Sequence, residues 1–297
     1  MNILTVKEMK MNGDLTRRLF IIAGASSIAA RPQFVAAATS FRLGLTPVFL
    51  DNDAVVIDKL RSALSAGMER PIELIQRRTY EEVTGLLLEG AVDAAWLCGY
   101  PFLQHVSTLS LVGVPVWQGK PLYQSYLIVS AGDDGVQGLE DLKNGTHAYS
   151  DPDSNSGWLV TASDIVRLGA RPDSFFSRSI FTYGHRNVVR AVASGLTRSG
   201  SVDGYVWEVL KLEEPDLAER TRVVTKSEWL GFPPIVARKD RVSSDDIVLL
   251  RDVLQRITQD ELGRQALSAL HLDAVRPGSF DLYDGIAARM SDVSVFR

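Results

Sequence analysis

The chain has 297 residues, of which 45% are hydrophobic and 23% are charged, and its formal net charge is −4. These proportions are typical of a globular protein. The negative balance leaves no basic stripe to neutralise phosphates, which argues against a nucleic-acid partner. A single cysteine, Cys98, excludes a disulfide within the chain.

The first 38 residues are typical of an export signal. Residues 16–20 carry twin arginines, an apolar stretch follows over residues 19–30, and residues 36–38 form a small-residue cleavage pattern. The apolar stretch is shorter than the roughly 20 residues that span a bilayer. We therefore expect residues 1–38 to be a twin-arginine signal peptide and the mature protein to be soluble in the periplasm. An uncleaved membrane anchor is the alternative.

Beyond the signal, short apolar segments alternate with amphipathic ones. This alternation favours an α/β fold with mostly parallel sheets flanked by helices. Strands are predicted at residues 41–47, 72–77, 94–98, 109–116, 125–131, 146–150, 179–183, 202–206, 222–225 and 235–238. Helices are predicted at residues 54–66, 80–89, 158–168, 186–194, 244–258, 261–270 and 282–290.

Two segments interrupt the alternation and indicate crossings between two lobes. They are "GKPLYQSYLIV" at residues 119–129 and "TKSEWLGFPPIVARK" at residues 225–239. We predict that lobe 1 contains residues 39–122 and 229–297, and that lobe 2 contains residues 123–228. Ligands of such folds bind in the cleft at the carboxyl ends of the strands.

The segment "YSDPDSNSGWLV", residues 149–160, leads from a predicted strand into a helix. Ser154, Asn155, Ser156 and Gly157 stand at the helix start, where backbone N–H groups lack partners within the helix. These N–H groups and the positive end of the helix dipole suit an oxyanion. One of the two serines is also expected to cap the helix.

Two further strand ends carry candidate ligand contacts. In "FTYGHRNVVRAVASG", residues 181–195, His185 opens a helix directly after a strand. In "GSVDGYVWEVL", residues 200–210, Asp203 is placed to accept a hydrogen bond from a protonated ligand oxygen or amine. A helix cap for His185 and a turn residue for Asp203 are the structural alternatives.

These segments, together with "VDAAWLCGYPF" and "LYQSYLIV", resemble the phosphate, phosphite and phosphonate solute-binding proteins of ABC transporters over nearly all of residues 41–240. The resemblance implies the two-lobed fold of type II periplasmic binding proteins, in which hinge motion closes the lobes on a ligand. It implies that residues 154–157, His185 and Asp203 hold the ligand. It also implies that Tyr123 and Ser125, at the first crossing, contact the ligand.

The chain departs from typical phosphonate binders at Cys98-Gly99, where they carry Gly-Pro, and at Asn155, where they carry Ser or Thr. It is similar to a branch that binds arsenite and reports it to a sensor histidine kinase, whose hallmark is one cysteine in a W-x-C-G stretch. This resemblance implies an As(III)–sulfur bond at Cys98, next to Trp96, with the thiol pKa lowered by a nearby helix N-terminus or histidine. Alternatively, Cys98 lines the pocket as a small apolar residue.

The sequence thus predicts a periplasmic solute-binding protein that captures a small oxyanion or oxyacid, with arsenite sensing through a kinase as the first hypothesis. The alternative is the substrate-binding component of an ABC transporter for phosphonate, phosphite or phosphate, with a permease as partner. A thiol-dependent enzyme built on Cys98, His185 and Asp203 is a remote alternative, because no nucleophile-elbow, zinc-protease or Walker motif is present. We expect a monomer without a cofactor, and without a metal site other than As(III) at Cys98.

Overall fold

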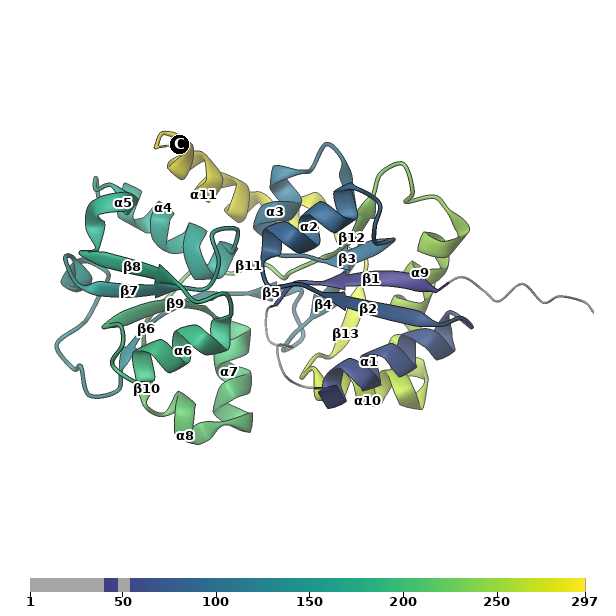
Figure 1. The fold of residues 1–297 in the computed structure, drawn as a ribbon, viewed down its shortest axis with the longest axis horizontal. Coiled ribbons are helices and arrows are strands. Elements are labelled where there is room, and N and C mark those ends of the chain that lie inside the picture. Colours follow the sequence, from purple (N-terminus) through teal and green to yellow (C-terminus); the bar gives the residue numbers. More distant parts are fainter. Residues whose placement is uncertain (1–39, 48–53, 297) are drawn as a thin grey trace, which may run out of the picture. The chain divides into compact units, whose positions relative to one another are not determined.

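The computed structural model describes residues 40–47 and 54–296, and Figure 1 shows two β-sheets, each flanked by helices. The predicted signal peptide lies outside the described residues. Among the described helices, none combines the length and the hydrophobicity needed to cross a bilayer.

The first sheet has the strand order β13-β4-β12-β3-β1-β2. Its strands are β1 (Phe41–Leu45), β2 (Ile72–Gln76), β3 (Ala94–Trp96), β4 (Leu109–Val116), β12 (Ile235–Arg238) and β13 (Ala274–Arg276). The helical segments of this half are α1 (Ala54–Gly67), α2 (Tyr80–Leu88), α3 (Gly99–Gln104), α9 (Asp245–Arg256), η3 (Ile257–Gln259), α10 (Glu261–Ala269), η4 (Phe280–Tyr283) and α11 (Asp284–Ser294).

The second sheet has the strand order β10-β6-β9-β7-β8. Its strands are β6 (Ser125–Ser130), β7 (Thr146–Tyr149), β8 (Arg178–Phe181), β9 (Ser199–Asp203) and β10 (Thr221–Lys226). Its helical segments are η1 (Glu140–Leu142), the π-helical η2 (Asn155–Leu159), α4 (Val160–Arg167), α5 (Pro172–Phe175), α6 (His185–Ala193), α7 (Gly204–Glu213) and α8 (Pro215–Ala218).

Both sheets are mixed, which corrects the expectation of mostly parallel sheets. β1 is parallel to β2 and β3, and β7 is parallel to β8 and β9. The strands next to the crossings, β4, β6 and β12, pair antiparallel with their neighbours. The physical reason is the chain path, because a strand that enters a sheet from the other half meets strands already running the opposite way.

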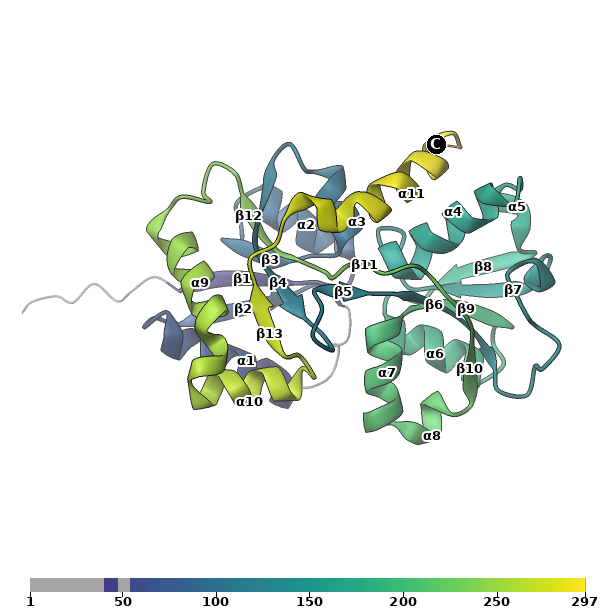
Figure 2. The same cartoon turned by 180° about the vertical axis from the view of Figure 1, so that it is seen from behind.

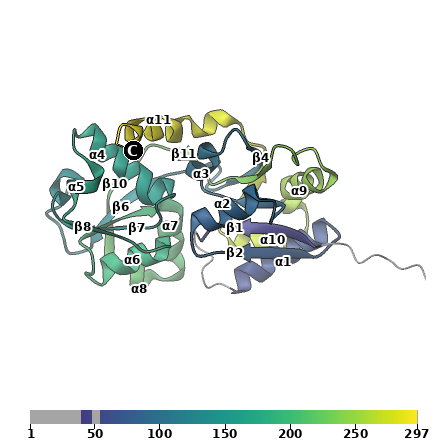
Figure 3. The same ribbon diagram turned by 45° about the horizontal axis from the view of Figure 1, so that its top comes forward.

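The two crossings lie side by side as a short ribbon. β5 (Leu122–Tyr123) pairs antiparallel with β11 (Leu230–Gly231), with Tyr123 opposite Leu230 (Figure 2). A third connection comes from the C-terminal helix. α11 packs against α3 of the first half and against η2 and α4 of the second (Figure 3).

The strand predicted at residues 202–206 is wrong in its position. β9 ends at Asp203, and α7 begins at Gly204, so Tyr205 belongs to a helix. The Asp203 side chain caps this helix, because its Oδ1 accepts hydrogen bonds from the backbone N–H groups of Tyr205 (2.9 Å) and Val206 (3.3 Å). The cap outweighs the strand propensity of the aromatic and β-branched residues that follow.

His147 is a fully buried titratable residue of the second half. Its ring nitrogens lie 2.7 Å from Ser199 Oγ and 2.8 Å from Ser201 Oγ, and the ring stacks on Phe176. Burial lowers the pKa of His147 to about 3, so the imidazole stays neutral in the folded protein. In the unfolded chain it takes up a proton near pH 6.5, so its contribution to stability is lost as the pH falls from there toward 3.

We expect His147→Gln to lose less stability than the wild type between about pH 7 and about pH 5. The difference should be about 2 kcal/mol, as 1.4 kcal/mol accrues per pH unit below the unfolded pKa. Urea unfolding of both proteins at the two pH values measures it. Parallel losses in the two proteins would show that His147 can be protonated in the folded state.

Candidate functional site

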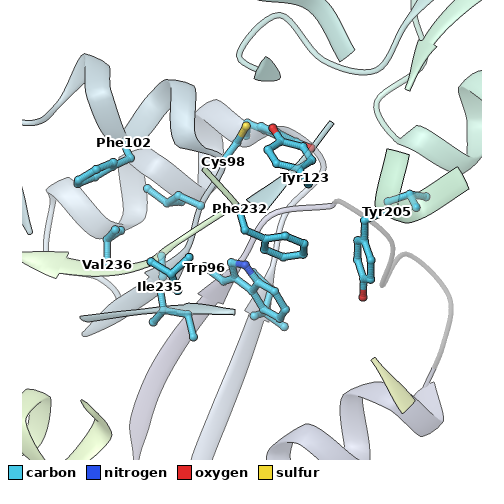
Figure 4. Close-up of a cluster of buried hydrophobic side chains, with 14 of the residues drawn as sticks. Trp96, Cys98, Phe102, Tyr123, Tyr205, Phe232, Ile235 and Val236 are labelled. Atoms are coloured by element: carbon cyan, nitrogen blue, oxygen red, sulfur yellow. The ribbon is translucent and has the colours of Figure 1, made fainter. Parts of the chain in front are cut away.

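Cys98 lies between β3 and α3 and is 3% exposed. Its Sγ accepts a hydrogen bond from the backbone N–H of Asn155 at 3.3 Å, so the thiol of the first half contacts the Ser154–Gly157 loop of the second half. Figure 4 shows the sulfur beside the Tyr123 phenol. Cys98 and the Ser154–Gly157 loop, each of them a candidate ligand contact in the sequence, are therefore in contact in the structure.

The predicted lowering of the Cys98 pKa is wrong. Burial raises the pKa of this thiol to about 11, and the hydrogen bonds from the Tyr100 and Asn155 backbones oppose the shift without cancelling it. Asp203 raises it further by electrostatic repulsion. The sulfur is therefore a neutral thiol at neutral pH, and a group that bonds to it has to displace the thiol proton.

The loop at the start of η2 is tied to its surroundings by its own small side chains. Ser154 Oγ accepts a hydrogen bond from the Gly157 N–H at 3.0 Å, which confirms the predicted serine cap. Ser125 Oγ donates to the Ser156 carbonyl at 2.6 Å, so Ser125 supports the loop from β6. The loop residues 154–157 are all buried.

Asn155 links this loop to the crossing ribbon. Its Nδ2 donates a hydrogen bond to the Tyr123 hydroxyl at 2.8 Å. Its Oδ1 is buried and has no hydrogen-bond partner among the described residues. Asn155 therefore presents an acceptor that a hydroxyl or amine group can satisfy.

His185 is a buried residue at the start of α6 with both ring nitrogens engaged. Its Nδ1 accepts a hydrogen bond from the Asp203 backbone N–H at 3.0 Å, which places the ring proton on Nε2. Nε2 lies 3.2 Å from the Tyr80 hydroxyl oxygen and donates to it. Burial lowers the pKa of His185 to about 3, so the ring is neutral. The Tyr80 hydroxyl keeps its own proton, because burial raises its pKa.

The N-terminus of α6, unlike that of η2, has no capping side chain. Gly184 precedes the helix and provides no cap, and both Gly184 and His185 are buried. A buried helix start without a capping side chain needs another acceptor for its N–H groups. A bound oxyanion supplies such acceptors.

Asp203, whose backbone N–H binds His185, is 1% exposed. Burial raises its carboxyl pKa to about 7, against the lowering effect of the Val206 and Tyr205 amides. Its charge raises in turn the pKa values of Tyr80, Cys98 and Tyr123, after the larger effect of burial on each. These groups of the two halves therefore share one electrostatic environment.

Trp96 is the last residue of β3 and is buried. Its indole Nε1 donates to the Pro233 carbonyl at 2.9 Å, and Figure 4 places the ring beside Phe232. The indole N–H is therefore hydrogen-bonded to the segment between β11 and β12. Trp96 contributes apolar surface next to the predicted site.

Tyr80 and Asp151 were not among the residues predicted from the sequence. The Tyr80 backbone N–H donates to Asp151 Oδ2 at 3.2 Å across the two halves. A signal for Tyr80 was present, because Thr79 and Glu82 form a capping box that starts α2 after β2. A strand followed by a capped helix start is the same pattern that identified Ser154–Gly157.

The comparisons with known proteins agree with this architecture. The family model of periplasmic substrate-binding proteins of phosphonate ABC transporters matches residues 43–283. The phosphate-import protein PhnD of Mycolicibacterium smegmatis is 24% identical in an alignment of 227 residues, which covers 71% of this chain and 71% of that protein.

Two solved structures show the same fold. The binding protein of an ABC phosphonate transporter from Pseudomonas aeruginosa has a TM-score of 0.76 and 21% identity, covering 84% of this chain and 85% of its own. PhnD1 from Prochlorococcus marinus, in complex with methylphosphonate, has a TM-score of 0.74 and 16% identity, covering 86% and 98%. The predicted two-lobed fold of type II periplasmic binding proteins is confirmed. The chain belongs to the family of periplasmic substrate-binding proteins of phosphonate ABC transporters.

Proposed function

We propose that the chain is the substrate-binding component of an ABC transporter and captures a phosphonate, phosphite or phosphate between its two lobes. The observation that carries this proposal is the buried, uncapped start of α6. Its His185 contacts the Tyr80 hydroxyl, and the Tyr80 N–H binds Asp151 just before the Ser154–Gly157 loop. N–H groups of two helix starts and the Tyr80 hydroxyl supply donors for the oxyanion.

The proposal assigns roles to the predicted site residues. Ser156, His185 and Asp203 belong to the ligand shell, and Ser154 and Ser125 hold the loop in place through their hydrogen bonds. Tyr123 stands at the ribbon that joins lobe 1 (residues 39–122 and 229–297) to lobe 2 (residues 123–228). Export to the periplasm by the twin-arginine route, a monomeric state and docking to a permease belong to the same proposal.

A second candidate ligand is arsenite, with a sensor kinase as partner. The contact between Cys98 Sγ and the Asn155 N–H favours it, because a ligand held at this helix start meets the sulfur. Arsenous acid would exchange one hydroxyl for the sulfur and release water, with the thiol proton leaving in that water. The family match favours transport over sensing as the main function.

A thermal-shift series with methylphosphonate, phosphite, phosphate and arsenite tests both candidates on the wild type and on Cys98→Ala. A ligand at 100 times its Kd stabilises the folded protein by about 2.7 kcal/mol. We expect a phosphorus oxyacid to raise the Tm of both proteins. Stabilisation of the wild type alone, by arsenite alone, would replace the first candidate by the second. No shift with any of the four would contradict both.

A further inference from the structure

Two short segments, one from each half, face each other next to the candidate site. The first is residues 78–80, which lead from β2 into α2, and the second is residues 183–185, which lead from β8 into α6. The Tyr80 hydroxyl lies 3.2 Å from His185 Nε2, and the Tyr80 N–H donates to Asp151 Oδ2 at 3.2 Å. The end of the first segment that begins α2 is therefore held against the second half.

A further contact joins the other ends of the same two segments. The guanidinium carbon of Arg78 lies 5.2 Å from the centre of the Tyr183 ring, which is a cation–π contact. Arg78 is exposed and Tyr183 is half-buried, whereas Tyr80 and His185 are buried. We call Arg78 and Tyr183 the outer pair, because they lie closer to the solvent than the Tyr80–His185 contact.

The backbone of both segments supports this arrangement. Thr79 is extended, with φ −120° and ψ 160°, and side chains on either side of an extended residue point to the same face. Arg78 and Tyr80 therefore both turn toward the second half. Tyr183 has a φ of +53°, in the left-handed region that is uncommon for residues other than glycine. Strained conformations of this kind are concentrated at ligand clamps and switching segments.

We propose that the outer pair retains the ligand, because it forms when the two halves close and has to break before the ligand can leave. This inference rests on the proposed function, since it concerns release from the same site. The Ser154–Gly157 loop and His185 are buried, so release requires the halves to separate by hinge motion. Separation parts residues 78–80 from residues 183–185 and breaks the outer pair in the same step.

The outer pair therefore acts on release and not on capture. Capture begins while the halves are apart, before Arg78 and Tyr183 meet, whereas release begins from the closed state. An exposed cation–π contact changes an equilibrium constant by about two- to fivefold. Because the outer pair stands outside the ligand shell, this factor is the same for every ligand that the site accepts.

Stopped-flow fluorescence with methylphosphonate, phosphite and phosphate on the purified mature protein tests the proposal. Trp158 of the second half stacks on Tyr100 of the first, with 6.1 Å between the ring centres, so closure changes the surroundings of a tryptophan. In Arg78→Met and in Tyr183→Asn we expect koff to rise about two- to fivefold, by the same factor for each ligand that binds. Asparagine tolerates the left-handed backbone at residue 183, so this variant removes the ring without a new backbone conflict.

Arg77→Met is the matched control, because it removes the same charge one residue away. The Arg77 guanidinium donates to the Gln76 carbonyl of its own segment at 2.8 Å, so this variant should keep the wild-type koff. Any loss of long-range attraction for an anion appears as a lower kon in both arginine variants alike. Tyr183→Phe keeps the ring and should also keep the wild-type koff.

The variant with both Arg78→Met and Tyr183→Asn should release the ligand no faster than either single variant, because one contact is lost in all three. Wild-type koff in Arg78→Met, additive increases in the double variant, or factors that differ between ligands would overturn the retaining role. Arg78 is exposed, so Arg78→Met remains a test if Tyr183→Asn fails to fold. Absence of binding by all three ligands to the wild type would instead contradict the proposed function.

Discussion

Replacing Gly157 with alanine is expected to weaken ligand binding by about 100-fold or more, the equivalent of losing a hydrogen bond to a charged group. A Cβ at this position would lie 1.8 Å from Ser150 Oγ, 2.7 Å from Ser150 Cβ and 2.9 Å from Ser154 Oγ. Both serines are fully buried, and the Ser150 N–H also donates to the Gly157 carbonyl at 3.2 Å. The added methyl group therefore has to push the loop away from β7.

This displacement acts on the N–H groups that we assign to the oxyanion. It also separates Ser154 from its cap position and moves Asn155 relative to Cys98 and Tyr123. Overpacking of this kind costs about 1–3 kcal/mol of stability. We expect a folded protein with a lowered Tm, and calorimetric titration with the ligand found for the wild type measures the loss of affinity.

Gly85→Ala is the matched control for this prediction. Gly85 lies within α2, and a Cβ there would have open space around it, with no atom of another segment within 4 Å. Alanine should stabilise the helix by up to about 1 kcal/mol and leave the affinity unchanged. Adding Ser150→Gly to the Gly157→Ala variant removes the closest contacts and should restore part of the binding. Wild-type affinity in Gly157→Ala itself would show that this loop does not hold the ligand.

The sequence predicted elements well where the local pattern and the tertiary structure agree. β4 and β12 have the predicted bounds, because each is a mostly apolar and mostly buried run. The prediction failed at residues 202–206, where strand-forming residues follow a residue that caps a helix. β13 was missed because its three residues carry no period of their own and form a strand only by pairing with β4.

For the candidate site too, local patterns predicted some residues and tertiary contacts determined the others. Small polar residues at strand ends identified Ser156, His185 and Asp203, and all three are buried in one region. A local signal marked the helix start at Tyr80, but its contact with His185, 105 residues away in the other half, was beyond the reach of local patterns. The Cys98 pKa was predicted in the wrong direction because a sequence shows the helix start next to the thiol but not its burial.

Replacing Arg289 with methionine should lower the free energy of unfolding by about 3 kcal/mol. Arg289 lies on α11 and is 2% exposed, and its guanidinium donates to Glu228 at 2.6 and 2.8 Å and to Asp164 at 2.7 Å. Breaking a buried ion pair costs about 3–5 kcal/mol. We expect the lower end, because Glu228 and Asp164 are nearly half exposed and regain water when the arginine is removed.

Arg167→Met is the matched control, since Arg167 lies at the same interface of α4 with α11 and pairs with Asp292 at 2.8 Å. Its side chain is 47% exposed, so its removal should cost no more than about 1 kcal/mol. Urea unfolding of the two variants measures the difference. Equal losses in the free energy of unfolding would show that the burial of Arg289 does not strengthen its ion pairs. Arg289→Lys should fall in between, because an ammonium group keeps the charge but not the two-pronged contact with Glu228.

The loss should extend to ligand binding as well. Arg289 Nη1 also donates to the Val160 carbonyl at 3.0 Å, directly after the π-helical segment that begins at Asn155. Glu228 lies between β10 and β11, so one side chain of the C-terminal helix connects this crossing to the helix that follows the Ser154–Gly157 loop. A variant without it has to order this loop when the ligand binds, and that ordering lowers the affinity. Weaker binding in Arg289→Met than in Arg167→Met, measured where both proteins are fully folded, would separate this effect from the loss of stability.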